Sequence, residues 1–266
     1  MKILKAPNYA NVEYYRYFNE YYNKIYVITI RRAHERQEEI RKVLNGLNFE
    51  FFVGTDKNDW TKEKFIEKGI YNEALAIKTH RYGKTMSLGE VAAACSHKQV
   101  YEDVIKNKFE KVLIFEDDVI PDFSQLPFVP AILNELPKDC ELLYWGYQTK
   151  YLKRNLFTFL RTYVYHVQHK MGLLTWNHKM IRNLQPVRKS GHISKSGFHD
   201  MIHAYGITRV AAEKLLNWNS PVHYTADTGI SYAILNEVLT AYITHPEIFK
   251  QEQQTDPLSY KSLIKH

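Results

Sequence analysis

Short apolar runs alternate along this chain with longer stretches in which apolar residues recur at helical spacing. The runs predicted to be strands are 24–30, 49–53, 112–115, 141–145, 204–208 and 241–244. The stretches with helical periodicity are about 33–47, 88–107, 209–218 and 228–238. Strands that alternate with helices are typical of α/β proteins. We therefore expect an α/β fold with a mainly parallel sheet flanked by helices.

The composition of the 266 residues excludes several other classes of protein. Aromatic residues make up 14% of the chain, which is too many for a chain that stays disordered. The two cysteines, Cys95 and Cys140, are too few for a disulfide scaffold. No apolar stretch reaches the roughly 18–20 residues that span a bilayer, and residues 1–23 lack the apolar core of a signal peptide. We expect a cytoplasmic protein with a tyrosine-rich amphipathic N-terminal segment, 1–23, before one domain, 24–266.

The charges are distributed unevenly along the chain. No Asp or Glu occurs between Leu142 and His199, where ten Lys and Arg residues lie, although the whole chain carries only +7. The region 148–199 has no clean periodicity, so we expect it to be a partly mobile basic excursion from the sheet. A basic region of this kind attracts phosphates, nucleic acids or anionic membrane surfaces.

Three consecutive carboxylates, Glu116, Asp117 and Asp118, directly follow the apolar run 112–115. In open α/β sheets, ligands bind beyond the carboxyl ends of the strands. Adjacent like charges raise one another's pKa, so a cation must offset them there. Mg²⁺ and Mn²⁺ take one or two carboxylates together with substrate phosphates. The motif predicts a metal that holds a nucleotide pyrophosphate, and the alternative is a solvated acidic turn before Pro121.

The predicted helix 88–107 carries polar residues near the centre of its apolar face. Ser87 and Glu90 have the spacing of a capping box. On a helical wheel, Glu90 and His97 both lie near the middle of the apolar arc. Because buried polar groups need hydrogen-bond partners, these two either bond within the core or line a site.

Together these motifs resemble glycosyltransferase family 25, which includes bacterial lipopolysaccharide and lipooligosaccharide sugar transferases and procollagen galactosyltransferases. The central match is Ser87-x-Gly89-Glu90, then Ser96-His97, then Glu116-Asp117-Asp118-Val119. Outlying matches are Val27–Ile30 with Arg32 and Arg36, Gly54–Asp56, Ala204–Thr208 with Ala211–Leu216, Pro221 with Asp227, and His245-Pro246 with Gln251. The chain departs from the family pattern at Thr29, where asparagine is usual, at Ala93, where cysteine is usual, and in the basic excursion, which has no counterpart.

The resemblance implies a GT-A-like, Rossmann-like fold and an inverting transferase. Such an enzyme moves a hexose, galactose or glucose, from a UDP-sugar to a glycan or glycolipid acceptor, in lipopolysaccharide or other surface-glycan assembly. We assign Mn²⁺ or Mg²⁺ to Glu116 and Asp118, with His245 as a third ligand. The residues expected around the donor are Thr29, Arg32, Arg36, Asp56, Glu90, His97 and Asp117. For the base that takes the acceptor proton we favour Asp227 over Asp200, although either could be only a helix cap.

The basic excursion is expected to face the acceptor. Its segment Tyr151–Arg161 mixes cations with aromatic residues, as at a membrane interface, so an anionic membrane surface with a phosphorylated glycolipid is a predicted partner. The location would then be the cytoplasm, including the inner face of the membrane. An ordinary solvated loop is the alternative.

Three other functions fit parts of the sequence. A nucleic-acid-binding module would explain the basic span, but it leaves the carboxylates at 116–118 unexplained, so we expect no nucleic acid. A metal-dependent phosphoesterase would use the same carboxylates with His199, Asp200 and His203. A degenerate, non-catalytic sugar-binding relative is disfavoured by the intact carboxylate motif.

Overall fold

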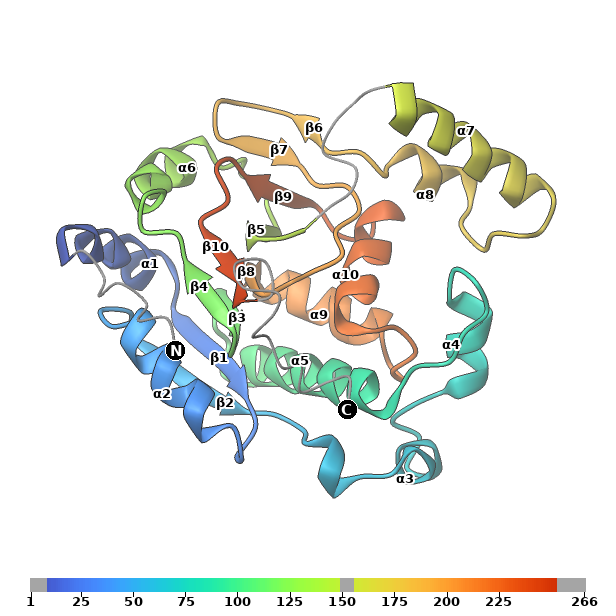
Figure 1. Cartoon of the computed structure of the whole chain (residues 1–266), viewed down its shortest axis with the longest axis horizontal. Helices are drawn as coiled ribbons and strands as arrows, with labels where there is room; N and C mark the ends of the chain where they lie inside the picture. The colour runs from blue at the N-terminus through green and yellow to red at the C-terminus, as the bar shows by residue number, and fades with distance from the viewer. Residues whose placement is uncertain (1–8, 149–155, 253–266) are drawn as a thin grey trace.

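The computed structural model describes residues 9–148 and 156–252 and confirms the predicted α/β fold (Figure 1). Its main sheet has the strand order β2-β1-β3-β8-β5-β9-β7-β6. These strands are β1 (Lys24–Thr29), β2 (Phe49–Val53), β3 (Lys111–Glu116), β5 (Leu142–Gly146), β6 (Val187–Arg188), β7 (Ile193–Lys195), β8 (Ala204–Thr208) and β9 (Ala241–Thr244). All six predicted strands are present, and the short β6 and β7 are additional.

The sheet is mixed, and six of its eight strands run in one direction. β1 pairs in parallel with both β2 and β3, and β5 pairs in parallel with β9. β8 is reversed and lies between β3 and β5, and β7 is reversed beside β9. The carboxyl ends of β1, β2 and β3 therefore meet at one edge of the sheet, where ligands bind in α/β folds.

Helices cover both faces of the sheet. On one face pack α1 (Tyr15–Tyr21), α2 (His34–Val43) and α6 (Val129–Glu135), and on the other α5 (Leu88–Lys106), α9 (Arg209–Trp218) and α10 (Ala226–Leu235). Successive side chains of a strand point to opposite faces. In β3, Leu113 and Phe115 accordingly join the first core cluster, whereas Val112 and Ile114 join the second. This explains why the strand is apolar at every position from 112 to 115.

Shorter elements surround the sheet. They are η1 (Tyr9–Tyr14), η2 (Lys57–Asp59), α3 (Lys62–Glu67), α4 (Glu73–Thr79), η3 (Leu126–Phe128), α7 (Leu156–Lys170), α8 (His178–Arg182) and the two-stranded sheet of β4 (Val119–Pro121) and β10 (Phe249–Gln251). Since Gln251 is paired with Val119, β10 lies directly beside the turn that follows β3. In the two described ranges, no helix combines the length and apolarity needed to cross a bilayer.

The basic region 148–199 is more regular than expected. It contains α7, α8 and the β6–β7 hairpin, and the hairpin extends the main sheet because Ile193 pairs with Thr244 of β9. The prediction of an excursion from the sheet is therefore wrong for this hairpin, which is part of the sheet. Residues 149–155, which include most of the cationic start of the expected membrane segment, lie outside the described residues.

The end of the N-terminal segment is part of the core rather than a surface helix. Tyr15 and Phe18 of α1 are fully buried, and Tyr22 just after it is 6% exposed. The Trp145 indole N–H donates a hydrogen bond to the Tyr22 hydroxyl at 2.6 Å. A Cβ on Gly206 would overlap the same hydroxyl, so this close approach requires glycine. Residues 1–8 lie outside the described residues.

We expect Tyr22→Phe to lower the free energy of unfolding by about 1–3 kcal/mol, because the buried Trp145 N–H would lose its acceptor. Urea denaturation measures this change. Tyr21→Phe is the matched control, since the Tyr21 hydroxyl has no hydrogen bond within the described residues. Equal stability of the two variants would contradict the assigned role of Tyr22.

Candidate active site

The three predicted carboxylates lie where β3 ends, in the turn before β4, and they are not out in bulk solvent. The exposed fractions of the side chains are 28% for Glu116, 10% for Asp117 and 5% for Asp118. Asp117 is tied to the first half of the sheet. It accepts hydrogen bonds from the Thr29 hydroxyl at 2.7 Å and from Arg36 Nη1 at 2.8 Å. The end of β1 and the helix α2 thus hold the turn in place.

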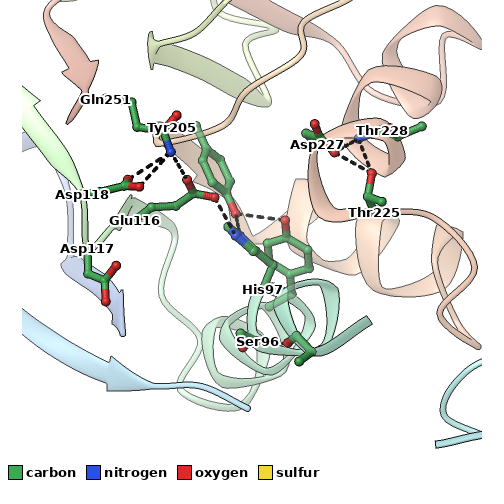
Figure 2. A network of polar contacts seen from close by, with 12 residues as sticks. Ser96, His97, Glu116, Asp117, Asp118, Tyr205, Thr225, Asp227, Thr228 and Gln251 are labelled. Atoms are coloured by element: carbon green, nitrogen blue, oxygen red, sulfur yellow. Dashed lines mark hydrogen bonds and ion pairs between the residues drawn. The ribbon is translucent and has the colours of Figure 1, made fainter. Parts of the chain in front are cut away.

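Glu116 and Asp118 face one donor from the other end of the chain. Gln251 Nε2 is 3.3 Å from Glu116 Oε2 and 3.0 Å from Asp118 Oδ2, so the amide lies between the two carboxylates (Figure 2). Arg36 Nη1 is 3.8 Å from Asp118 Oδ2. Burial, and then the charge of Glu116, raise the pKa of Asp118 to about 7. Burial acts in the same direction on Glu116, but His97, together with the charges of His203 and Arg36, outweighs it and lowers the pKa of Glu116.

The chemistry of this donor set fits a hard divalent cation. The available groups are carboxylate oxygens, and the pKa of Asp118 is raised first by burial and then by the charge of Glu116, although Arg36 and Gln251 act in the opposite direction. A cation between Glu116 and Asp118 would offset the charge of both. Within residues 9–148 and 156–252, however, no three His, Cys, Asp or Glu side chains are arranged to hold a metal. Any further ligands would have to be water or substrate oxygens.

The structure does not bring His245, the predicted third ligand, to the carboxylates. Its Nε2 is 2.9 Å from the Ser194 hydroxyl of β7, and its Nδ1 is 3.5 Å from the Tyr147 hydroxyl. His245 follows β9, which is separated from β3 in the sheet by β8 and β5. A histidine at a strand end therefore reaches the metal position only if its strand is close to β3, and this one is not.

A cavity of about 120 Å³ opens beside the carboxylates, and we call it the β1 cavity. It is lined by the end of β1, the loop after β2, the first three turns of α5 and the turn after β3. The predicted donor-site residues that line it are Thr29, Arg32, Arg36, Asp56, His97 and Asp117. Arg32 Nε pairs with Asp56 Oδ2 at 2.6 Å, and Asp56 also caps η2 through the Asn58 N–H. Six of the seven predicted donor residues are thus brought together.

His97 is held by two buried tyrosines. Its Nδ1 is 2.7 Å from the Tyr205 hydroxyl, which is 3.0 Å from the Tyr101 hydroxyl (Figure 2). These contacts leave Nε2 3.6 Å from Glu116 Oε1. Both earlier interpretations of His97 therefore hold, because it is bonded within the core and also lines the β1 cavity.

Ser96, the neighbour of His97 on α5, fixes the loop after β2. Its hydroxyl accepts the Thr55 N–H at 2.9 Å and donates to the Ala92 carbonyl at 2.9 Å. A Cβ on Gly54 would overlap the Ser96 side chain. The sequence motifs include Ser96 and Gly54 but assign neither a role. Their close approach explains why small residues are needed at both positions.

A second, larger cavity of about 650 Å³ adjoins the first, and we call it the α10 cavity. Both predicted base candidates, Asp200 and Asp227, line it, and it shares Ala93, Glu116 and Gln251 with the β1 cavity. Asp227 lies in the first turn of α10, on the opposite side of the site from Asp118 (Figure 2). The two cavities therefore meet at Glu116.

Burial raises the pKa of Asp227 to about 6. Two hydrogen bonds act in the opposite direction: Asp227 Oδ1 accepts from the Thr225 hydroxyl at 2.5 Å and from the Thr228 N–H at 2.7 Å. A carboxylate with this pKa is mostly ionised at pH 7 and is still basic enough to accept a proton in a reaction. Asp227 also serves the first turn of the helix, so the capping and basic roles are compatible.

Glu90, the seventh predicted donor residue, lines the α10 cavity and not the β1 cavity. Its carboxylate accepts the Ser87 N–H at 2.7 Å, which confirms the capping box. Glu90 and His97 are seven residues apart, about 10 Å along the helix axis, and so reach different cavities although they share a face. The structure thus does not bring Glu90 together with the other six residues, and its assignment to the donor stays a prediction.

The histidines of the alternative phosphoesterase site are enclosed by the core. His199 is fully buried, and its ring packs against Tyr144 and Tyr147. His203 is also fully buried, and its Nε2 donates to the Phe249 carbonyl at 3.0 Å. Neither lines the β1 or the α10 cavity, so of the three residues only Asp200 does.

Comparison with known proteins identifies related sequences. The family model of glycosyltransferase family 25 (LPS biosynthesis protein) matches residues 22–230. A "Glycosyltransferase 25 family member" of Drosophila melanogaster is 25% identical over 130 residues, which are 47% of this chain and 21% of that protein. One of Anopheles gambiae is 29% identical over 98 residues, 36% of this chain and 16% of that protein.

A human relative with the name "Inactive glycosyltransferase 25 family member 3" is 26% identical over 99 residues, which are 37% of this chain and 17% of that protein. The chain thus matches only 16–21% of the length of these three relatives. What the relatives do as whole proteins does not transfer to this chain by similarity alone.

We expect Thr225→Val to raise the pKa of Asp227 above about 6, because the lost hydroxyl donates to the ionised carboxylate. The pH dependence of the Asp227 carboxyl ¹³C shift measures it. Thr228→Val is the control, since it keeps the backbone N–H that binds Asp227. A Thr225→Val pKa at or below that of the wild type would contradict the described geometry.

Proposed function

The chain belongs to glycosyltransferase family 25, and from this premise we propose that it transfers a hexose from a UDP-sugar to a glycan or glycolipid acceptor with inversion at the sugar carbon. The observation that carries the proposal is the junction of the two cavities at Glu116. One cavity holds arginines and carboxylates suited to a nucleoside diphosphate, and the other holds the carboxylates Asp200 and Asp227, either of which can serve as base. A sugar at the junction would touch both.

The β1 cavity supports donor binding. Arg32 and Arg36 line it, and each is oriented by a carboxylate, at 2.6 Å and 2.8 Å respectively. A guanidinium that is oriented in this way presents several N–H groups to phosphate oxygens. Asp56 and Thr29 offer further polar groups for the nucleoside. Galactose and glucose are the proposed sugars, on the resemblance to the family.

Glu116 and Asp118 are the proposed holders of Mn²⁺ or Mg²⁺, without His245. Such an ion, when bound, stabilises the negative charge of a departing diphosphate as a Lewis acid. Arg36, which pairs with Asp117 and lies near Asp118, would stabilise the same negative charge of the diphosphate. Gln251 keeps the Glu116 and Asp118 carboxylates together, so their oxygens are positioned before any ion arrives.

Asp227 is the proposed base. The acceptor hydroxyl gives its proton to the Asp227 carboxylate while its oxygen forms a bond to the anomeric carbon. At the same time the bond from that carbon to the diphosphate oxygen breaks, and the electron pair leaves with UDP. Because attack and departure occur on opposite faces of the sugar, the configuration inverts. Asp200, in the same cavity, is the competing candidate.

The place of the reaction in lipopolysaccharide or other surface-glycan assembly is proposed from the family description, which names LPS biosynthesis. The α10 cavity, at about 650 Å³, is large enough to take a sugar-sized acceptor. A second candidate function is donor binding without transfer, because one relative is named inactive. The two functions differ in whether Asp227 matters for turnover.

We expect Mn²⁺ together with a UDP-hexose to raise the melting temperature, because ligands that bind the native state stabilise it. Asp118→Asn should remove most of the shift. Asp122→Asn is the matched control, since Asp122 pairs with Lys250 outside both cavities. A screen of nucleotide sugars with and without Mn²⁺ measures this directly. An equal shift in Asp118→Asn, or none in the wild type, would rule out the proposed metal site.

We expect Asp227→Asn to lower the transfer rate by about 10²–10⁴-fold and to leave the donor-induced thermal shift unchanged. With the wild-type protein, kcat/KM should rise with pH through about 6 and then level off, as the Asp227 carboxylate loses its proton. Product analysis with an acceptor present separates transfer from hydrolysis. Should Asp200→Asn abolish transfer while Asp227→Asn retains it, Asp200 is the base and our assignment fails.

A further inference from the structure

The helix α7 exposes an almost entirely apolar face to solvent. Seven apolar or aromatic residues of this segment are between 38% and 82% exposed: Phe157, Phe159, Leu160, Tyr163, Val164, Val167 and Met171. At 100° per residue they occupy one half of the helical wheel. We call this set the α7 face. Figure 1 shows α7 at the periphery of the molecule, beside α8.

The opposite side of α7, which packs on the protein, carries several polar groups. Thr158 is 5% exposed, and its carbonyl accepts a hydrogen bond from the Thr162 hydroxyl at 2.8 Å. Tyr165 is buried against the Trp176 ring. A helix that only packs on a soluble protein buries its apolar side and exposes its polar side. In α7 a contiguous apolar patch faces outward as well, and such a patch marks an interaction surface.

The charge around the α7 face indicates an anionic occupant. No Asp or Glu occurs from Leu142 to His199, and ten Lys and Arg lie in that span, of which Arg161 and Lys170 belong to α7 itself. Lys170 is exposed on the same half of the helix as the apolar residues. A second copy of this chain would bring the same positive charge to the contact and be repelled. An anionic bilayer offers both an apolar interior and negative headgroups.

The buried side of α7, and not the α7 face itself, contacts the segment after α4 that leads to the α10 cavity. The Arg81 guanidinium lies over the Tyr165 ring at 4.5 Å and over the Trp176 ring at 4.1 Å. The Thr175 hydroxyl donates to the His80 carbonyl at 3.4 Å, and His80 lines the α10 cavity. The helix α7 is thus joined by direct contacts to a segment that lines the cavity proposed for the acceptor.

We propose that α7 is an interfacial membrane helix: its apolar face enters the headgroup region of an anionic bilayer while the basic residues near it contact the lipid phosphates. The helix lies along the surface and does not span it. The further step, that binding presents a lipid-linked acceptor to the α10 cavity, rests on the proposed function. Membrane binding itself does not depend on catalysis.

Co-sedimentation of the full chain with lipid vesicles tests the proposal. We expect binding to vesicles of phosphatidylcholine with phosphatidylglycerol, little binding to phosphatidylcholine alone, and weaker binding at high salt. Leu160→Ser with Val164→Ser should weaken the partitioning at least about tenfold, because two apolar side chains no longer enter the bilayer. The matched control is Ile66→Ser with Val210→Ser, two residues of similar size and exposure on α3 and α9.

Several outcomes would overturn the proposal. The first is that the wild type does not bind the anionic vesicles. The second is that the two double variants lose vesicle binding equally. The third is that the α7 variant dissociates a dimer and the wild type does not bind vesicles. The last result would make the α7 face a self-association surface. Urea denaturation of the α7 variant serves as the check on folding. The Mn²⁺ and UDP-hexose thermal shift, measured separately, distinguishes this proposal from the proposed function, since either can fail without the other.

Discussion

The site depends on keeping three carboxylates together at the end of a buried strand. Burial disfavours an ionised carboxylate and like charges repel one another, and both effects, burial first, raise the pKa of Asp118. Donors from four separate elements offset the negative charge: Thr29 of β1, Arg36 of α2, His97 of α5 and Gln251 of β10. The sheet order places β1 beside β3, and the pairing of β10 with β4 delivers the last donor. The fold thus brings three carboxylates together and surrounds them with donors from four elements.

Much of this was predictable from sequence because local patterns determined it. The run 112–115 is apolar at every position since β3 is covered on both faces, and the carboxylates that follow it had to lie at the edge where ligands bind. The capping box at Ser87 and Glu90 is equally local. Six of seven predicted donor residues line one cavity because the parallel strands β1, β2 and β3 end at one edge, although they are far apart in the chain.

The failures concern features that only tertiary structure determines. His245 has the expected position at a strand end, but the sheet order, which sequence periodicity does not reveal, places β9 away from β3. The reversal of β8 between β3 and β5 was hidden for the same reason. α7 escaped notice because apolar and aromatic side chains occur on both of its faces, as Tyr163 and Tyr165 illustrate, so its period is blurred. Gln251 is only an outlying motif match in the sequence, and the pairing of β10 with β4 is what gives it a role.

The pairing of β10 with β4 also bears on which part of the chain is needed for a complete site. The family match ends at residue 230, whereas β9 and β10 come later in the chain. A fragment trimmed to the matched segment would lose β9 from the interior of the sheet. It would also lose the Gln251 amide, which lies between Glu116 and Asp118. The segment that aligns with the family is therefore shorter than the segment needed to complete the site, because Gln251 lies beyond residue 230.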